Sequence, residues 1–243
     1  MNKSQLDNFI TKYTLGGEIK STKWTSNGNS LSTRFISGDK SVVGKVELSK
    51  FNHLSPCELG VYNTGQLSSL LSVLGDDVDV SLSNSGDKFI SMEFVDTKRK
   101  TKSKYMLSDL SVIPTPPELK NLPDSFELGI KVDPYFVNTF ISGKGALSEA
   151  ETFTILTENN ETKIVIGYAS IASNRVTIPV ETTKYKEIEP ISFNANMFAS
   201  ILNANKDCES ATLEVSSAGL SRIQFSIDNY NSEYFLVSTQ AVN

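Results

Sequence analysis

The chain has 243 residues, 39% hydrophobic and 21% charged, with a formal net charge of −5, the composition of a globular protein with a substantial core. No apolar run approaches the roughly 20 residues of a membrane span, and the first residues lack the apolar centre of a signal peptide, so we expect a cytoplasmic protein that is neither secreted nor membrane-bound. Residues 1–125 hold 15 basic and 14 acidic side chains and residues 126–243 hold 8 and 14, so charge alone does not favour nucleic-acid binding.

Residues that bind metals or act as nucleophiles are scarce in this sequence. The two cysteines, Cys57 and Cys208, form no CxxC pair, and His53 is the single histidine. In a cytosolic chain we expect the two thiols to be buried rather than joined in a disulfide. We therefore predict no metal site, no cofactor and no catalytic residues.

The first half of the chain predicts two short helices, each followed by strands. The first helix spans 3–14, with a capping box formed by Ser4 and Asp7 and an end at Gly16-Gly17; the second spans about 63–74 and ends at Gly75. Both have apolar residues at the i, i+3, i+4, i+7 spacing of one helix face, namely Leu6, Phe9, Ile10 and Tyr13, then Leu67, Leu70, Leu71 and Leu74. Alternating runs predict antiparallel strands at 17–24, 30–37, 41–49, 78–83 and 88–96.

Four of the eight prolines fall in one segment and predict an extended connector. They are Pro114, Pro116, Pro117 and Pro123. Proline cannot donate to a sheet ladder and disfavours helix at the preceding residue. We therefore predict two domains, 1–112 and 126–243, joined by a connector at 113–125.

The second half repeats the pattern of the first. A third helix begins at Asp133-Pro134, a capping residue followed by proline in the first turn, and ends near Gly143 and Gly145. A fourth spans 194–205. Their predicted inward residues are Phe136, Val137, Phe140 and Ile141, then Phe198, Ile201 and Leu202. Strands are predicted at 151–158, 162–170, 211–217, 221–228 and 232–239. The fold class is therefore α+β, with two tandem similar domains.

Two helices in opposite halves have nearly the same sequence pattern. The stretch YNTGQLSSLL begins at Tyr62 and FNANMFASIL at Phe193, a constant offset of 131 positions. A short helix with one apolar stripe cannot stand alone, so we expect each to lie on a sheet and to expose its other face.

The exposed helix faces carry small neutral side chains where surface helices usually carry Glu and Lys. They include Asn8, Thr11 and Lys12, then Ser68, Ser69 and Ser72, then Asn138, Thr139 and Ser142, then Ala199, Ser200 and Asn203. Two interpretations stay open. The faces are neutral surface or pack against a partner, or they approach a polyanion without repelling it.

These features together resemble the DNA polymerase sliding clamps, and among them those of T-even-type bacteriophages, which share the fold of proliferating cell nuclear antigen. The most specific stretches are VYNTGQLSSLLSVLGDDVDVSLS, from Val61, and the segment from Phe126 through Tyr168. The resemblance implies the DNA clamp fold, with antiparallel outer sheets and short helices on an inner concave face. It implies a head-to-tail homotrimer around duplex DNA, tethering of a replicative DNA polymerase, loading by an ATP-driven clamp loader, and a role in late transcription. Encirclement would explain the acidic chain, since tight phosphate contacts would hinder sliding.

The resemblance also suggests candidate residues. Lysines in or beside the four helices are expected to face DNA, or else to be solvated surface: Lys3, Lys12, Lys144 and Lys206. The densest basic run is Lys98, Arg99, Lys100, Lys102 and Lys104; we interpret it as a DNA contact on its charge alone, the alternative being a solvated loop.

A partner-peptide pocket and a subunit contact are further implications of the resemblance. The pocket positions are Phe35, Ile36, Val42, Val43, Val112, Ile113, Phe235, Leu236 and Val237, and the alternative for them is ordinary core. Subunits are expected to join through edge strands at 104–112 and 174–182, with Tyr105, Leu107, Val176 and Ile178 at the interface.

Two other classes of protein are weighed against this interpretation. A β-rich structural or carbohydrate-binding phage protein would expose aromatic platforms, and the single Trp24 together with the repeated helices argues against it. A small-molecule enzyme would need a convergent catalytic set, and the GxxxxGK[ST], HExxH and GxSxG motifs are all absent.

Overall fold

The computed structural model describes residues 1–118, 122–123, 125–169 and 174–239, which divide into two compact units. Unit 1 comprises Met1–Gly38, Gly44–Pro117 and Asp228–Ser232, and unit 2 comprises Asp39–Val43, Glu118–Ile227 and Glu233–Asn243. The domain boundaries predicted at 112 and 126 stay predictions, because part of the connector, 119–121 and 124, lies outside the described residues.

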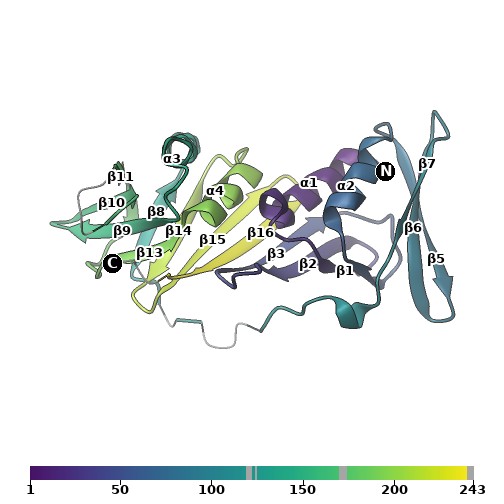
Figure 1. The fold of residues 1–243 in the computed structure, drawn as a ribbon, viewed down its shortest axis with the longest axis horizontal. Helices are drawn as coiled ribbons and strands as arrows, with labels where there is room; N and C mark the ends of the chain where they lie inside the picture. The colour runs from purple at the N-terminus through teal and green to yellow at the C-terminus, as the bar shows by residue number, and fades with distance from the viewer. Residues whose placement is uncertain (119–121, 124, 170–173, 240–243) are drawn as a thin grey trace. The chain divides into compact units, whose positions relative to one another are not determined.

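Unit 1 contains two helices and two sheets. Its elements are α1 (Lys3–Thr14), the 3-10 turn η1 (Leu15–Gly17), β1 (Thr22–Ser26), β2 (Ser30–Ile36), β3 (Val42–Ser49), β4 (Cys57–Val61), α2 (Thr64–Ser72), β5 (Val78–Ser85), β6 (Lys88–Asp96), β7 (Lys102–Met106) and the 3-10 turn η2 (Leu110–Val112). One set of strands has the order β3-β2-β1-β4 and the other β5-β6-β7. β1 pairs antiparallel with β2 and β4, and β6 pairs antiparallel with β5 and β7. Figure 1 shows α1 and α2 side by side on one face of β1–β3, and the two helices contact each other.

The core of unit 1 forms where the apolar stripe of α1 meets the sheet. Phe9 and Tyr13 pack edge-on against Trp24 of β1, with ring centroids 5.5 Å and 6.3 Å away. The Trp24 Nε1 donates to the Tyr13 hydroxyl at 3.2 Å, so the buried indole N–H is satisfied. The stripe predicted from the spacing, Leu6, Phe9, Ile10 and Tyr13, is buried throughout.

The start of α1 differs from the predicted capping box. Asn2 is the N-cap, and its side chain accepts the Ser4 N–H at 3.0 Å, so Ser4 lies inside the helix and the Ser4–Asp7 prediction is wrong. Asn binds an unpaired N–H of the first turn as well as Ser does. The helix ends at Thr14, and the capping residue Leu15 adopts the left-handed conformation (φ 48°) just before the predicted Gly16-Gly17 stop.

Unit 2 repeats the combination of helices and antiparallel strands. Its elements are β8 (Leu128–Val132), α3 (Pro134–Ala146), β9 (Thr152–Glu158), β10 (Glu161–Ile166), β11 (Val176–Val180), β12 (Thr182–Lys184), β13 (Ile191–Asn194), α4 (Ala195–Ala204), β14 (Ala211–Ser216), β15 (Leu220–Ile227) and β16 (Tyr230–Val237), whose first residues belong to unit 1. One set of strands has the order β12-β8-β14-β15-β16 and the other β11-β10-β9-β13. The two helices contact each other, and α4 also contacts β9 and β13.

A cluster of phenylalanines forms the core beneath α3 and α4. Phe153 of β9 stacks on Phe198 of α4 with ring centroids 4.9 Å apart. Phe140 of α3 meets both rings edge-on, at 5.2 Å from Phe153 and 4.9 Å from Phe198. All three side chains are fully buried, so this cluster joins both helices to one sheet.

Several strands lie elsewhere than predicted. The predicted strand at 17–24 begins only at Thr22, because the 3-10 turn η1 continues from α1 as far as Gly17. The predicted edge strand at 104–112 ends at Met106, and Leu110–Val112 form η2, which is capped by the Asp109 side chain. The short strands β4, β8, β12 and β13 were not predicted. Both cysteines are free, with Cys208 buried and Cys57 half-buried.

The turn between β6 and β7 is anchored by a nearly buried carboxylate. Asp96 is 2% exposed. Its oxygens accept the N–H groups of Arg99 at 2.7 Å, Gly75 at 2.8 Å and Lys98 at 2.8 Å. These bonds join the end of α2 to the turn, and they lower the pKa of Asp96 from its usual value.

No described helix is long and apolar enough to span a membrane.

We expect Asp96→Asn to destabilise unit 1 at neutral pH. An amide keeps one accepting oxygen but turns an NH₂ group toward the Gly75 N–H. Because the pKa of Asp96 is lower in the folded chain, its carboxylate contributes stability above the unfolded pKa of about 4, and this contribution is lost as the pH falls further. The gap in unfolding midpoint between wild type and variant, followed by circular dichroism, should shrink below about pH 4. Asp79→Asn, at an exposed position of β5, is the control; a gap that does not depend on pH would contradict the account.

We expect Phe153→Ala to destabilise the protein by about 3–5 kcal/mol, because it removes the ring shared by α3, α4 and β9 and leaves a cavity. Urea unfolding measures this loss. Tyr135→Ala is the control, since Tyr135 is 76% exposed and its truncation should change stability by no more than about 0.5 kcal/mol. Equal losses in the two variants would disprove the cluster's role.

Candidate nucleic-acid interface

The helix surfaces are almost free of negative charge. The four α-helices contain one acidic residue, Asp7, of the 28 in the chain. Burial raises the pKa of the Asp7 carboxyl, and nearby Lys3 opposes that shift. The exposed helix positions are instead neutral and polar, among them Asn8, Thr11, Gln66, Ser69, Ser72, Asn138, Ser142, Asn196 and Asn203. Within each unit, therefore, the helices present a surface that does not repel an anion.

The first turns of the helices add to this character. No first turn contains an acidic residue, and three of the four N-caps are neutral asparagines, namely Asn2, Asn63 and Asn194. Asp133 caps the remaining helix, α3. The N-terminal end of a helix carries a partial positive charge, and only at α3 does a carboxylate compensate it.

Two of the four predicted DNA-facing lysines are buried by their own units. Lys12 is 6% exposed, and its ammonium lies 5.5 Å from the centre of the Tyr230 ring. Lys144 is 8% exposed and donates to the Ser148 carbonyl at 2.7 Å, so it binds the C-terminal end of its own helix. Their ammonium groups are engaged inside the fold, and we place no nucleic-acid contact on them.

The other two predicted lysines differ in their surroundings. Lys3 is half-buried and donates to the Leu74 carbonyl at 2.9 Å, which ties the start of α1 to the end of α2. Lys206, which follows α4, is exposed.

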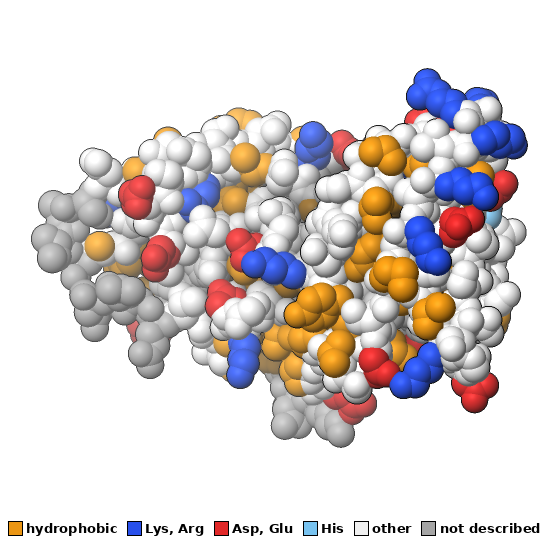
Figure 2. All heavy atoms as spheres, turned by 45° about the vertical axis from the view of Figure 1, so that its right-hand side comes forward, with side chains coloured by type: hydrophobic (Ala, Val, Ile, Leu, Met, Phe, Trp, Pro, Cys, Tyr) orange, Lys and Arg blue, Asp and Glu red, His pale blue; other side chains and the backbone are white. Residues whose placement is uncertain are grey.

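The basic run lies on the turn and edge strand that Asp96 anchors. Lys98, Arg99, Lys100, Lys102 and Lys104 are all exposed. Lys98 pairs with Asp77 at 3.2 Å, and the Asp77 carbonyl accepts the Thr97 N–H, so the turn adjoins the end of α2. Figure 2 shows Lys and Arg side chains gathered at the upper right of the view, on the side of unit 1 that carries β5, β6 and β7. The basic turn, residues 97–101, is thus attached to the helical side of unit 1. Asp96 itself was missed from the sequence; the signal for it was an Asp followed by a turn, the pattern of a side chain that accepts nearby N–H groups.

The residues predicted for a partner-peptide pocket are mostly buried. Phe35, Val42, Val43, Ile113, Phe235 and Leu236 are buried and Ile36 is half-buried, while Val112 and Val237 are exposed at 57% and 44%. For the six buried positions the structure supplies the alternative role, which is ordinary core. Their use in partner binding stays a prediction.

The two strands predicted to join subunits both lie at the edge of a described sheet. β7 pairs with β6 alone and β11 with β10 alone among the described strands. The side chains named for the interface turn largely inward, since Tyr105 and Ile178 are buried and Leu107 and Val176 are half-buried. The Tyr105 hydroxyl accepts the Asn63 N–H at 2.9 Å inside unit 1. A neighbouring subunit would therefore meet the main-chain N–H and C=O groups of these strands more than the side chains named for the interface.

Within the described residues, no three His, Cys, Asp or Glu side chains gather as a metal site would require. No family model and no curated protein matches the sequence significantly. Among solved structures, the chain is similar to the crystal structure of proliferating cellular nuclear antigen from Entamoeba histolytica, with a TM-score of 0.75 and 14% sequence identity over 98% of this chain and 96% of that one. The chain therefore has the DNA clamp fold, as the sequence predicted.

Proposed function

We propose that the protein is a sliding clamp, a ring of identical chains that encircles duplex DNA and tethers a replicative DNA polymerase to it. The observation that carries this proposal is the near absence of acid from the four helices of a clamp-fold chain whose net charge is −5. An acidic protein that holds DNA by encirclement needs weak, sequence-independent contacts, and small neutral side chains supply them without strong attraction.

The basic turn supplies positive charge on the helical side of unit 1. Arg99 and Lys100 are exposed there, and the main chain beneath them is held by Asp96. Because these side chains are long and flexible, they can contact phosphates without fixing one register on the duplex. This supports the proposal that residues 98–104 contact DNA.

We propose that the ring closes by pairing β7 of one copy with β11 of the next, as a homotrimer. The register of β7 against β6 leaves the main chain free to do so. The Leu107 N–H donates to the Ile90 carbonyl, and the Asp96 N–H donates to the Thr101 carbonyl. The main-chain N–H and C=O groups of the odd-numbered residues in this segment therefore point toward β6. The N–H groups of Lys102, Lys104 and Met106 then point outward, because the two sides of an antiparallel strand alternate. Pro179 on β11 fits an edge strand, where a missing donor is tolerated.

The protein partners in this proposal follow from the clamp fold and from the resemblance to T-even-type phage clamps. They are the replicative DNA polymerase, an ATP-driven clamp loader and, in late transcription, the transcription machinery. The apolar pocket predicted for a partner peptide includes exposed Val112 and Val237. The protein itself would act as a binding and assembly protein without catalysis.

We expect the protein to stay on closed circular DNA once a clamp loader and ATP have placed it there. Linearising that DNA should release it, because a ring can slide off the end of a linear duplex but not off a circle. Lys104→Pro should abolish both retention and assembly, since proline removes an outward N–H without removing a bond to β6. Light scattering should show about three times the 26.7 kDa chain mass for wild type and one chain mass for the variant. Lys104→Ala, which keeps the N–H, is the matched control. A wild-type monomer at all concentrations, or equal retention on linear DNA, would refute the ring.

We expect the double variant Arg99→Ala with Lys100→Ala to weaken DNA contact without changing assembly. Each phosphate contact contributes about one to the slope of log affinity against log salt, so the slope should fall by about two in magnitude. Fluorescence anisotropy with a duplex over a salt series measures it. Lys186→Ala, on unit 2, is the control; an unchanged slope in the double variant would exclude the basic turn from the interface.

A further inference from the structure

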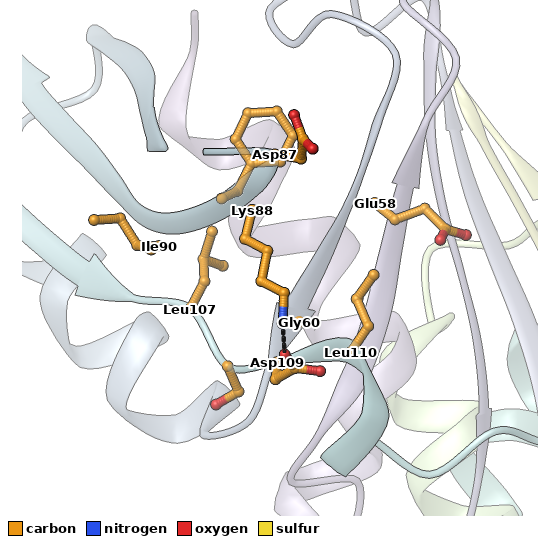
Figure 3. A pocket seen from close by; sticks show the side chains of 10 residues that line it. Glu58, Gly60, Asp87, Lys88, Ile90, Leu107, Asp109 and Leu110 are labelled. Atoms are coloured by element: carbon orange, nitrogen blue, oxygen red, sulfur yellow. Dashed lines mark hydrogen bonds and ion pairs between the residues drawn. The ribbon is translucent and has the colours of Figure 1, made fainter. Parts of the chain in front are cut away.

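An apolar groove in unit 1 lies beside the end of β7 and shares only Leu107 with the sites discussed above. A cavity of ≈ 470 Å³ opens between β4, the β5–β6 turn and the segment that leads from β7 into η2 (Figure 3). Its apolar walls come from Phe89, Ile90, Leu107 and Leu110. Phe89 and Ile90 are 36% and 38% exposed, which is high for large apolar side chains beside a concave surface.

A second cavity lies beside the first. It has a volume of ≈ 340 Å³, and Phe89 lines both cavities. On β4, Cys57 lines the second cavity and the next residue, Glu58, lines the first. Leu54, Val80 and Leu82 provide its apolar surface. We call the two cavities together the β4 groove. Because residues of β4 line both cavities, an extended chain that runs along this strand can reach both.

The main chain of β4 faces this groove. The Gly60 carbonyl accepts the Ser108 N–H at 2.9 Å, on the side of β4 away from β1. Since the two sides of an antiparallel strand alternate, the N–H and C=O of Glu58 point to the same side. Beyond the Gly60–Ser108 bridge, no described strand pairs with β4 there. A side chain at position 60 would bring its Cβ within 2.3 Å of the Ser108 oxygen, so glycine permits the crossing that closes one end of the groove.

The charge at the rim of the groove is acidic. Lys88 and Asp109 form an ion pair at 2.6 Å, which is neutral as a whole. In Figure 3 it crosses the view between Ile90 and Leu107 on one side and Glu58 and Leu110 on the other. The Lys88 ammonium, with help from the Ser111 N–H, holds the pKa of Asp109 well below its usual value, so the pair persists at neutral pH. Because that ion pair is neutral, Glu58 and Asp87 give the rim a net negative charge.

We propose that the β4 groove binds an extended segment of a partner protein in which apolar residues alternate with lysine or arginine. The segment would add a strand beside Glu58 through main-chain hydrogen bonds. One face of that strand would place apolar side chains on Ile90 and Leu107, and the other would turn cations toward Glu58 and Asp87. An acidic rim disfavours a nucleic acid as the occupant. The groove shares no residue with the predicted peptide pocket, and of the residues predicted for the subunit interface it contains only Leu107.

The test uses the purified full-length protein without DNA or loader, so it gives an answer whether or not the clamp proposal holds. The probes are synthetic peptides in which Leu or Val alternates with Lys, and matched peptides in which Glu replaces every Lys. We expect the basic peptides to bind by fluorescence anisotropy and to shift the amide resonances of Glu58, Ile90 and Leu107. The acidic peptides should bind more weakly by about tenfold or more.

Two substitutions locate the binding. Ile90→Lys places a cation in the apolar wall, and Asp87→Lys reverses the charge of the rim; each should weaken the basic peptides by about tenfold or more. Glu18→Lys, exposed elsewhere on unit 1, makes the same change of charge as the matched control and should have no effect. Circular dichroism confirms that the variants fold. Absence of binding, equal binding of acidic peptides, or shifts confined to other residues would overturn the proposal. So would concentration-dependent shifts of Glu58 and Ile90 without peptide in the Lys104→Pro variant, which cannot close the ring, because they would identify a second copy as the occupant.

Discussion

The structure depends on each short helix packing onto a sheet through one apolar stripe. Helices of this length are marginal alone in water, so burial of the stripe is what stabilises them. In unit 1 the stripe of α1 meets Trp24, and in unit 2 Phe140 and Phe198 meet Phe153. Because packing uses only one side of each helix, the opposite side is not constrained by the core. Glutamate and lysine would serve stability there at least as well as serine and asparagine, so the neutral faces call for an explanation beyond folding.

The distribution of charge fits that explanation. Two lysines within the helices are used by the fold itself: Lys12 lies over Tyr230, and Lys144 binds the Leu147 and Ser148 carbonyls just after α3. Exposed positive charge comes instead from the basic turn, which Asp96 fixes next to α2. A surface with little acid and a few flexible cations attracts DNA weakly. Such a surface suits a protein retained by topology.

Open strand edges are the second feature from which function follows. An unpaired edge invites pairing with another chain, and natural proteins usually block it. Here the N–H groups of Lys102, Lys104 and Met106 point outward from β7. On β4, the N–H and C=O of Glu58 point away from β1. We assign the first edge to a copy of the same chain and the second to a partner peptide. The two assignments rest on different neighbours, since lysines flank the first edge and an apolar groove with an acidic rim flanks the second.

The sequence by itself determined the helices, most of their buried positions and the fold class, because a stripe at helical spacing and a nearby Gly or Asn are local signals. Leu70 and Ile141, predicted to face inward, are only half-buried, and Lys12, predicted on an exposed face, is buried. It did not reveal β4, β8 and β13, which are short strands without clear alternation, placed by pairing with distant segments. It also misplaced the cap of α1, since Asn2 and Ser4 are both good caps and only the chain path distinguishes them. Tertiary structure alone decided which lysines are free, that Asp96 organises the basic turn, and that the Gly60–Ser108 crossing leaves a groove beside β4. Each of these depends on groups far apart in the chain that meet only when the sheets form.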